Sequence, residues 1–194
     1  MKHLTLFILI NLSFVTTFAQ TQSISNQHVY GTNNVEGYPG SIICQDGGIL
    51  LYCTTDMSIN GTKTSPSFGG SDIWLIKLDQ NNNYLWDKSF GGSDDEQLGS
   101  VIELNNGELL IGGTTKSPIS GNQTVGTKGL NDYWIIKLTS NGDEIWQKSF
   151  GGTDHDLMAD LIQINSNKYV LTGRSFSNIS GDKTELCRGS VDTW

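Results

Sequence analysis

The sequence is poor in the residues on which several common protein classes depend. It contains 3 cysteines and 3 histidines in 194 residues, and it has no His-Glu-x-x-His, Gly-x-Ser-x-Gly or phosphate-loop motif. Its 12 basic residues are outnumbered by 20 acidic ones, and the formal net charge is −8. Because nucleic acids and anionic membranes bind clustered lysine and arginine, which are absent here, neither is an expected partner. The missing motifs favour a protein that is not an enzyme.

Only one long apolar run is present, and it lies at the N-terminus. The segment Leu4–Val15 follows the basic opening Met1–His3 and precedes the small residues of Thr17–Ala19. This run is too short to cross a bilayer, and the three-part pattern predicts a secretory signal peptide over residues 1–19. An uncleaved anchor or a buried strand fits the pattern less well. We therefore expect a secreted or cell-surface protein with no membrane span in the mature chain, whose residues 20–29 form a short linker.

A repeat with a period of 60 residues fills most of the remaining chain. The segment Asp72–Leu78 recurs as Asp132–Leu138, and a third copy begins at Asp192. Between residues 71–94 and 131–154, 13 of 24 positions are identical, without insertion or deletion. A fixed period with self-similarity indicates a solenoid, a propeller or another tandem array.

Each unit reads as four short strands. A long polar connection separates the second strand from the third, and it carries an isoleucine (Ile59, Ile119 or Ile179) that we expect to pin the loop to the core. The third strand is apolar on both faces, as a strand covered on both sides requires. Glycine and asparagine mark the hairpin turns. In the second unit the expected strands are Leu98–Leu104, Leu109–Thr115, Tyr133–Leu138 and Glu144–Phe150.

Four antiparallel strands per unit, with no helical period, predict an all-β fold built from blades of a β-propeller. The expected units are 30–89, 90–149 and a truncated 150–194, which make just under three. Propellers close with about four to eight blades, so we expect this chain to be the N-terminal piece of a longer protein. A β-sandwich gives no reason for an exact repeat, and a parallel β-helix conflicts with the hairpin turns.

The repeated motifs resemble a known family. Gly91–Glu96, Asp132–Leu138 and Ile145–Gly152 are similar to the propeller-like tandem repeats common in exported proteins of Bacteroidetes, often followed by a type IX secretion C-terminal sorting domain. The residues from Tyr30 match only loosely. This resemblance implies a fold and an extracellular location rather than an activity.

The acidic turn after each Gly-Gly pair is the sharpest candidate site. It contains Asp94, Asp95 and Glu96 in one copy and Asp154 and Asp156 in the next. Such carboxylates could bind Ca²⁺. The spacing lacks the regularity of a known calcium loop, so the favoured interpretation is that Asp94 and Asp154 cap turn amides.

Two further groups of polar residues are candidate metal sites. Residues 79–83 look like the start of a calcium loop, but the second copy lacks the first carboxylate, and a plain hairpin is favoured. His155 lies between Asp154 and Asp156; a single imidazole in a polar turn is more often solvated than metal-bound.

Tryptophan recurs at two repeat positions. The first contains Trp74, Trp134 and Trp194, and the second contains Trp86 and Trp146. Such rings could stack on sugars, but packing of one unit against the next is the favoured interpretation.

The cysteines do not suggest a disulfide framework. Cys44 has an apolar residue at its repeat position, which is typical of a small core residue. The turn at residues 46–47 is expected to pair Cys44 near Ile49 rather than with Cys53. At most one disulfide could form among Cys44, Cys53 and Cys187.

These observations assign no catalytic, cofactor-binding or metal-binding residue. The preferred hypothesis is a non-enzymatic binding or structural module whose partner is an unknown extracellular protein or polysaccharide. The alternative is the propeller part of a carbohydrate-active or hydrolytic enzyme whose catalytic residues lie outside this chain. A third hypothesis is a structural repeat stabilised by calcium.

Overall fold

The computed structural model describes residues 27–56, 58–166 and 168–194, and this part of the chain forms strands, turns and bends without a helix. It therefore contains no helix that is long and apolar enough to span a membrane. The signal peptide predicted for residues 1–19 lies outside the described residues.

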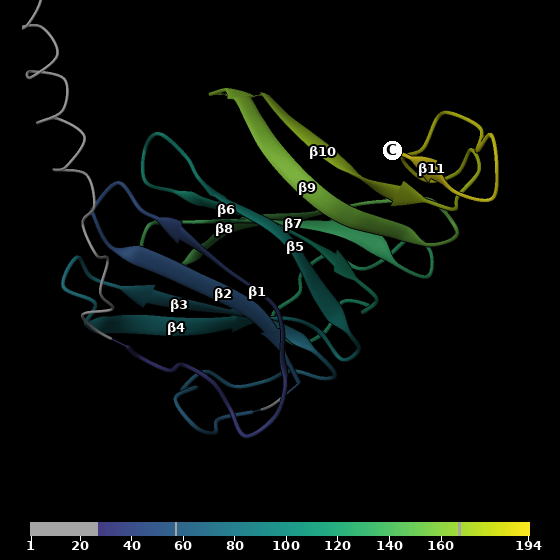
Figure 1. Ribbon diagram of the computed structural model, residues 1–194. Helices are drawn as coiled ribbons and strands as arrows, with labels where there is room; N and C mark the ends of the chain where they lie inside the picture. The colour runs from purple at the N-terminus through teal and green to yellow at the C-terminus, as the bar shows by residue number, and fades with distance from the viewer. Residues whose placement is uncertain (1–26, 57, 167) are drawn as a thin grey trace, which may run out of the picture.

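The strands form three antiparallel sheets, each following the order of the chain (Figure 1). The first sheet contains β1 (Glu36–Ile43), β2 (Ile49–Thr55), β3 (Asp72–Leu78) and β4 (Tyr84–Phe90). The second contains β5 (Glu96–Glu103), β6 (Leu109–Thr115), β7 (Asp132–Leu138) and β8 (Glu144–Phe150). The described part of the third contains β9 (Asp156–Asn165), β10 (Lys168–Ser175) and β11 (Asp192–Thr193).

The predicted strands are found within two residues of their expected ends. Strand β5 begins at Glu96 rather than Leu98, because Glu96 and Gln97 pair with the end of β6. The turns also agree: Gly107 and Gly142 have φ values of +80° and +75°, which glycine adopts without strain. The all-β prediction, with four antiparallel strands in each of the first two sheets, is confirmed.

The third strands are enclosed on both faces, as their continuous apolar pattern predicts. Every residue of β3 is buried, and in β7 only Lys137 is partly exposed. Side chains on one face of β7, such as Trp134 and Ile136, pack with Ile73 and Leu75 of β3. On the other face of β7, Tyr133 and Ile135 pack with residues of β9. The second sheet therefore lies between two hydrophobic cores, one shared with the first sheet and one shared with the third.

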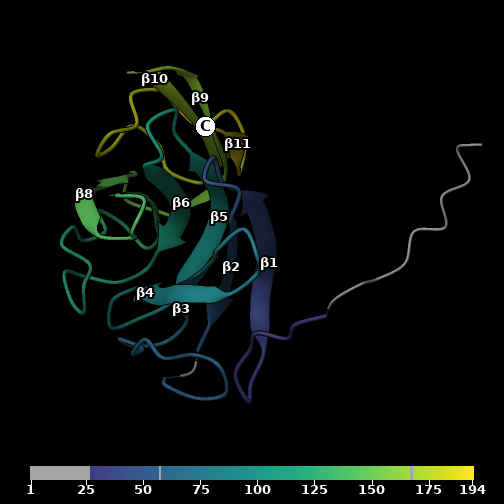
Figure 2. The same ribbon diagram turned by 90° about the vertical axis from the view of Figure 1, so that its left-hand side faces the viewer.

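The first strand of each sheet lies against the sheet before it. Strand β5 contacts β1, β2 and β3, and β9 contacts β5, β6 and β7. In Figure 2, β1 lies at the right-hand edge of the folded part, and β5 and then β9 follow above it. The same relation therefore joins the first sheet to the second and the second to the third.

The two glycines of β6 have separate roles. A Cβ on Gly113 would lie 2.6 Å from the Gln97 carbonyl oxygen, so this glycine lets the neighbouring strand approach closely. A Cβ on Gly112 would lie 2.2 Å from Met158 Cε, so this glycine makes room for a side chain of the third sheet.

The expectation that an isoleucine pins each long connection to the core is wrong. Ile59, Ile119 and Ile179 are 66%, 71% and 59% exposed. The largest buried side chain of the connection comes four positions later and is polar: Lys63 is 1% and Gln123 is 2% exposed. Hydrogen bonds to the loop's own carbonyl groups replace the expected apolar contact.

Candidate functional site

The acidic turn between β4 and β5 does not bring its three carboxylates together. Asp94 pairs with Lys116 at 2.9 Å, and Asp95 accepts a hydrogen bond from Ser71 N at 3.1 Å. Glu96 is 1% exposed, so it is directed into the protein. A calcium loop made from these three residues is therefore not formed.

The predicted capping role of Asp94 and Asp154 is confirmed. Asp94 Oδ1 accepts a hydrogen bond from Asp95 N at 3.1 Å, and Asp154 Oδ1 accepts one from His155 N at 2.8 Å. These bonds lie within the turns, where Asp94 is partly buried and Asp154 is exposed.

His155 bonds to a neighbouring loop rather than to the aspartates beside it. Its Nδ1 lies 2.5 Å from Asn131 Oδ1, and its ring meets Phe176 edge-on at 6.2 Å between centroids. Across the described part of the chain, no three His, Cys, Asp or Glu side chains gather as a metal site. The imidazole therefore ties the turn before β9 to the loop before β7.

The hairpin reading of residues 79–83 is confirmed. Asp79 Oδ1 accepts hydrogen bonds from Asn81 N and Asn83 N, each at 2.8 Å. Asn82 has a φ of +64°, a left-handed conformation that asparagine tolerates in turns. The Asp79 carboxylate is therefore engaged by its own turn.

A buried aspartate begins the third strand in each of the first two sheets, and the sequence analysis did not single it out. Asp72 is 0% exposed. Its Oδ2 accepts hydrogen bonds from Phe68 N at 2.8 Å and from Ser67 Oγ, whereas its Oδ1 has no hydrogen-bond partner. Burial raises the pKa of this carboxyl group.

A second buried carboxylate begins the next sheet and faces the first. Glu96 accepts hydrogen bonds from Gly92 N at 2.7 Å and Thr115 Oγ1 at 2.8 Å. A Cβ on Gly91 would lie 1.7 Å from Asp72 Oδ1 and 2.8 Å from Glu96 Oε2, so the two oxygens are at most about 4.5 Å apart. Burial raises the pKa of Glu96, and the charge of Asp72 adds to this effect. We call this pair the first junction.

The second junction repeats the arrangement one sheet later, with Asp132 at the start of β7 and Asp156 at the start of β9. Both residues are 0% exposed, and each has an Oδ1 without a hydrogen-bond partner. Burial raises the pKa of Asp132, and the charge of Asp156 contributes in the same direction. Because both carboxylates are enclosed, they are not placed to meet a polymer at the surface.

The sequence carries a signal for these junctions. Acidic residues recur at intervals of 60 in two sets, which are Asp72, Asp132 and Asp192, and Glu36, Glu96 and Asp156. Each set stands at the start of a strand. An acid kept at the edge of an apolar strand in every repeat points to a structural or ligand-binding role inside the fold.

The long connections are held by buried amino and amide groups. Lys63 Nζ donates to Ser65 O at 2.6 Å, and burial lowers its pKa. Gln123 Nε2 donates to Val125 O at 2.6 Å, and Lys183 Nζ donates to Ser175 Oγ at 2.8 Å. These three residues share one repeat position, so the same loop fold is built with either a charged or a neutral side chain.

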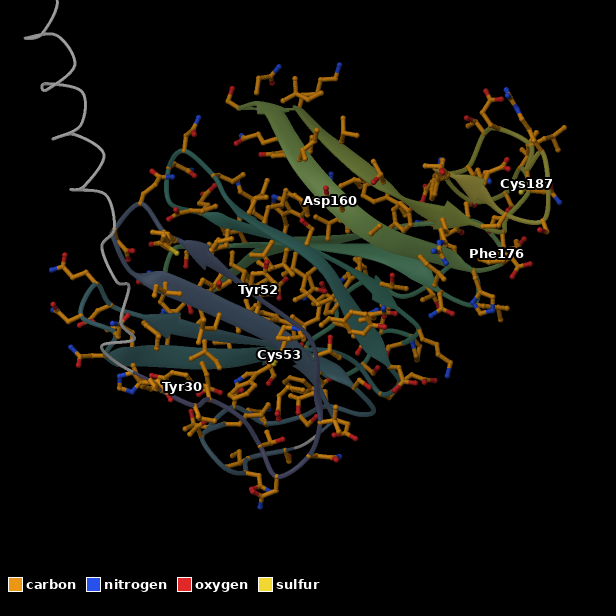
Figure 3. All side chains as sticks on the ribbon, viewed as in Figure 1. Tyr30, Tyr52, Cys53, Asp160, Phe176 and Cys187 are labelled. Atoms are coloured by element: carbon orange, nitrogen blue, oxygen red, sulfur yellow. The ribbon has the colours of Figure 1, made fainter. Side chains whose placement is uncertain are left out.

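The tryptophans of the first repeat position are packed. Trp74 and Trp134 are 1% and 0% exposed. Trp134 lies in the core between the first and second sheets, which confirms the packing interpretation for this residue. Trp74 lies on the other face of the first sheet, in a cluster with Tyr30 and Cys53. Figure 3 labels Tyr30 and Cys53.

The second tryptophan position is half-buried and close to lysine. Lys88 Nζ is 5.9 Å from the ring centroid of Trp86, and Lys148 Nζ is 5.4 Å from that of Trp146. Both rings also pack against the cores between the sheets. They are therefore packing elements rather than open platforms for sugars.

The cysteines are free. Cys44 lies in the core between the first and second sheets, as its repeat position predicted. Cys53 lies on the opposite face of the first sheet, and burial raises the pKa of its thiol to about 12. Cys187 belongs to the connection before β11, well away from Cys53 in Figure 3.

A hollow of about 440 Å³ opens between the long connection of the first sheet and the hairpin of the second. It is lined by Thr64, Pro66, Phe68 and Asn122, among others. The ion pair between Lys88 and Asp143, at 2.6 Å, lies in its wall. Its mixed polar and apolar lining suits contact with a polar polymer or a protein loop.

Comparisons with known proteins give one distant likeness. No family model matches the chain. The chain is 24% identical over 150 residues to the regulatory protein FlaEY of Caulobacter vibrioides. The alignment covers 73% of this chain and 16% of FlaEY, so this chain is similar to a small part of a much longer protein.

Proposed function

We propose that the chain is part of a β-propeller-type repeat module that acts in binding or scaffolding and carries out no catalysis. Two structural relations support this proposal. The same antiparallel meander occurs in successive sheets, and the first strand of each sheet lies against the sheet before it. Sheets related in this way can continue around an axis as blades.

The binding or scaffolding role is carried by one observation: the polar residues that could serve chemistry are used in structural contacts. Asp94 and Asp154 cap their own turns, His155 is bound to Asn131, and Asp79 closes a hairpin. Side chains held in this way position loops. The loops themselves then form the surface available to a partner.

The long connections are the proposed contact surface. Each presents an isoleucine at the same repeat position, and Ile59, Ile119 and Ile179 are all more than half exposed. Exposed apolar residues repeated in register are suited to a partner that is itself extended or repetitive, such as a polysaccharide or an extracellular protein. Export through the predicted signal peptide would bring the surface into contact with such a partner.

Two experiments test this proposal. An experimental structure of the purified chain should place β1, β5 and β9 nearest a common axis, whereas face-to-face sheets without an axis would contradict the propeller. Binding to a panel of extracellular polysaccharides and surface proteins should be weakened at least tenfold when Ile59, Ile119 and Ile179 are all changed to serine. The matched control changes Ile162, which is 52% exposed on β9, away from the connections.

The same reagents distinguish a binding module from the enzyme alternative. Any polymer that binds is incubated with the chain and examined for cleavage. Binding without cleavage supports the scaffold. Cleavage that disappears on substitution of a single carboxylate, such as Glu144 in the wall of the hollow, would show an enzyme instead.

A further inference from the structure

The second junction contains two enclosed carboxylates, and each of them has one oxygen without a hydrogen-bond partner. Asp132 Oδ2 accepts a hydrogen bond from Lys128 N at 2.6 Å. Asp156 Oδ2 accepts hydrogen bonds from Gly152 N at 2.7 Å and Ser177 Oγ at 2.8 Å. The Oδ1 atoms of both residues are buried without a partner. An ionised oxygen in this state is strongly unfavourable unless a proton or a cation accompanies it.

Both carboxylates are directed at the same Gly-Gly turn. A Cβ on Gly151 would lie 2.2 Å from Asp132 Oδ1, so this oxygen rests against the glycine backbone. Asp156 is bonded to the next residue, Gly152, through its other oxygen. The two side chains come from different sheets, β7 and β9, and the turn that precedes β9 brings them together.

The nearby lysines supply too little positive charge for two carboxylates. Lys128 Nζ is engaged at the surface by Asp182 at 2.6 Å and by Ser149 O at 2.8 Å. Lys183 Nζ donates to Ser175 Oγ, the hydroxyl of the residue paired with Asp156 in β10. At most one carboxylate charge is therefore compensated, and like charges held close together in a buried site repel.

The carboxylate oxygens of the first junction have more hydrogen-bond donors than those of the second. There the longer side chain of Glu96 reaches donors with both of its oxygens, at Gly92 N and Thr115 Oγ1. Only Asp72 Oδ1 is left without a partner. The shorter Asp156 leaves a second oxygen free, so the second junction offers two oxygens to a ligand where the first offers one.

We propose that Asp132 and Asp156 bind a metal cation of the Ca²⁺ type between the second and third sheets. Ca²⁺ takes six to eight oxygen ligands in flexible geometry, whereas Mg²⁺ demands a strict octahedron and retains several waters. The unpartnered Oδ1 atoms of Asp132 and Asp156 would ligate such an ion, and water would complete its coordination shell. This site differs from the acidic surface turn, because it uses Asp132 and excludes Asp154. It does not depend on the proposed function.

Calcium titration after treatment with a chelator is the direct test. Added Ca²⁺ should raise the melting temperature of the purified chain by about 5 °C, because an ion that binds only the folded state stabilises it. Terbium, a luminescent substitute for Ca²⁺, should be sensitised by Tyr133, which follows Asp132 in β7. Ca²⁺ should then displace the terbium signal.

Substitutions identify the ligands. Asp132→Asn and Asp156→Asn should each abolish the calcium-dependent rise in melting temperature and the terbium signal. Asp154→Asn is the matched control, because Asp154 is two residues away but exposed, and it should leave both signals unchanged. Loss of both signals in Asp154→Asn alone would move the site to the surface turn and overturn the proposal.

The chelated state provides a readout that a purely structural aspartate would not give. Without Ca²⁺, Asp156→Asn should be at least as stable as the unmodified chain, since it removes the repulsion and gives Asp132 Oδ1 an amide donor. If Ca²⁺ does not change the stability of the chain and stability falls as pH rises, then the two carboxyl groups share a proton instead of binding a cation. That result would refute the metal site.

Discussion

At the scale of single residues, Asp87 attaches the long connection of the first sheet to its outer strand. Its carboxylate accepts hydrogen bonds from Thr64 N, Ser65 N, Ser65 Oγ, Trp74 Nε1 and Tyr84 OH, among others. In the second sheet Gln147 performs part of this task, with its Oε1 accepting from Trp134 Nε1 at 3.1 Å and Thr124 N at 3.0 Å. The long connection is therefore held by a carboxylate in the first sheet and by an amide in the second.

Removal of the Asp87 carboxylate should destabilise the protein strongly. Asp87→Ala leaves several donors in and around the loop without an acceptor, and we expect the free energy of unfolding to fall by about 3 kcal/mol. Asp87→Gln, which introduces the residue found at this position in the second repeat, should lose less. Urea denaturation measures both values, and equal losses in the two variants would contradict the role of the hydrogen bonds.

The same residue predicts an acid-sensitive stability. Burial acts to raise the pKa of Asp87, but the hydrogen bonds from Ser65, Thr64 and Tyr84 outweigh it and hold the pKa below its ordinary value. Its contribution is therefore complete above the ordinary carboxyl pKa of about 4 and is lost as pH falls toward the depressed value. Unfolding followed between pH 6 and pH 2 should show a shallower acid limb in Asp87→Asn. An unchanged slope would argue against this assignment.

At the scale of elements, the first junction joins the start of β3 to the start of β5. Burial and the charge of Asp72 raise the pKa of Glu96 at this junction. The charged form of Glu96 is therefore disfavoured in the folded state. The stability associated with a raised carboxyl pKa is present at low pH and is lost as pH rises through that value.

Glu96→Gln should therefore stabilise the protein at neutral pH, by about 1 kcal/mol. The amide can still accept from Gly92 N and can donate to Thr115 Oγ1, while the repulsion with Asp72 disappears. The gain should shrink as pH falls, because the glutamate of the unmodified chain then becomes neutral as well. Chemical denaturation at pH 7.5 and pH 4 checks the sign, and a loss of stability at both pH values would refute it.

The long connections depend on a glycine at a fixed point. Gly121 has a φ of +59°, and a Cβ there would lie 2.5 Å from Gly91 O and 2.7 Å from Phe68 Cβ. Gly121→Ala should lower the free energy of unfolding by about 2 kcal/mol, through backbone strain and the clash. Gly189→Ala is the control, because a Cβ there meets no atom within 4 Å. Similar losses in both variants, measured by thermal unfolding, would contradict this explanation.

At the scale of the whole molecule, the packing of one sheet on the next holds the repeats together. Trp134 is central to it, because its ring is fully buried between the first and second sheets and its Nε1 bonds to Gln147. Trp134→Phe removes ring volume and this hydrogen bond, and we expect a loss of about 2 kcal/mol.

Hydrogen exchange can locate the effect of Trp134→Phe. Amide protection should fall in both β3 and β7, since the ring contacts both sheets. Trp86→Phe is the control, because Trp86 is only partly buried beside the same core. A loss of protection confined to the second sheet would show that the sheets are stabilised independently of one another.

Much of this architecture could be predicted from the sequence. The period of 60 residues, the hairpin glycines and the apolar third strands fixed the strand order, because local backbone preferences and burial on two faces leave a readable pattern. The long connections were predicted wrongly at Ile59, Ile119 and Ile179. An apolar residue in a loop does not reveal whether the core has room for it, and here Lys63 and Gln123 occupy the buried position.

The sequence by itself determined the repeat, the all-β class and the turn-capping role of Asp94 and Asp154, because each of these depends on residues that are near one another in the chain. Only the tertiary structure decided that Glu96 and Asp156 turn inward while their neighbours stay outside, and that they meet Asp72 and Asp132 across the junctions. The physical reason is that the charge environment of a carboxylate is set by what lies opposite it on the neighbouring sheet. The spacing of residues along the chain does not show which carboxylates face one another across neighbouring sheets.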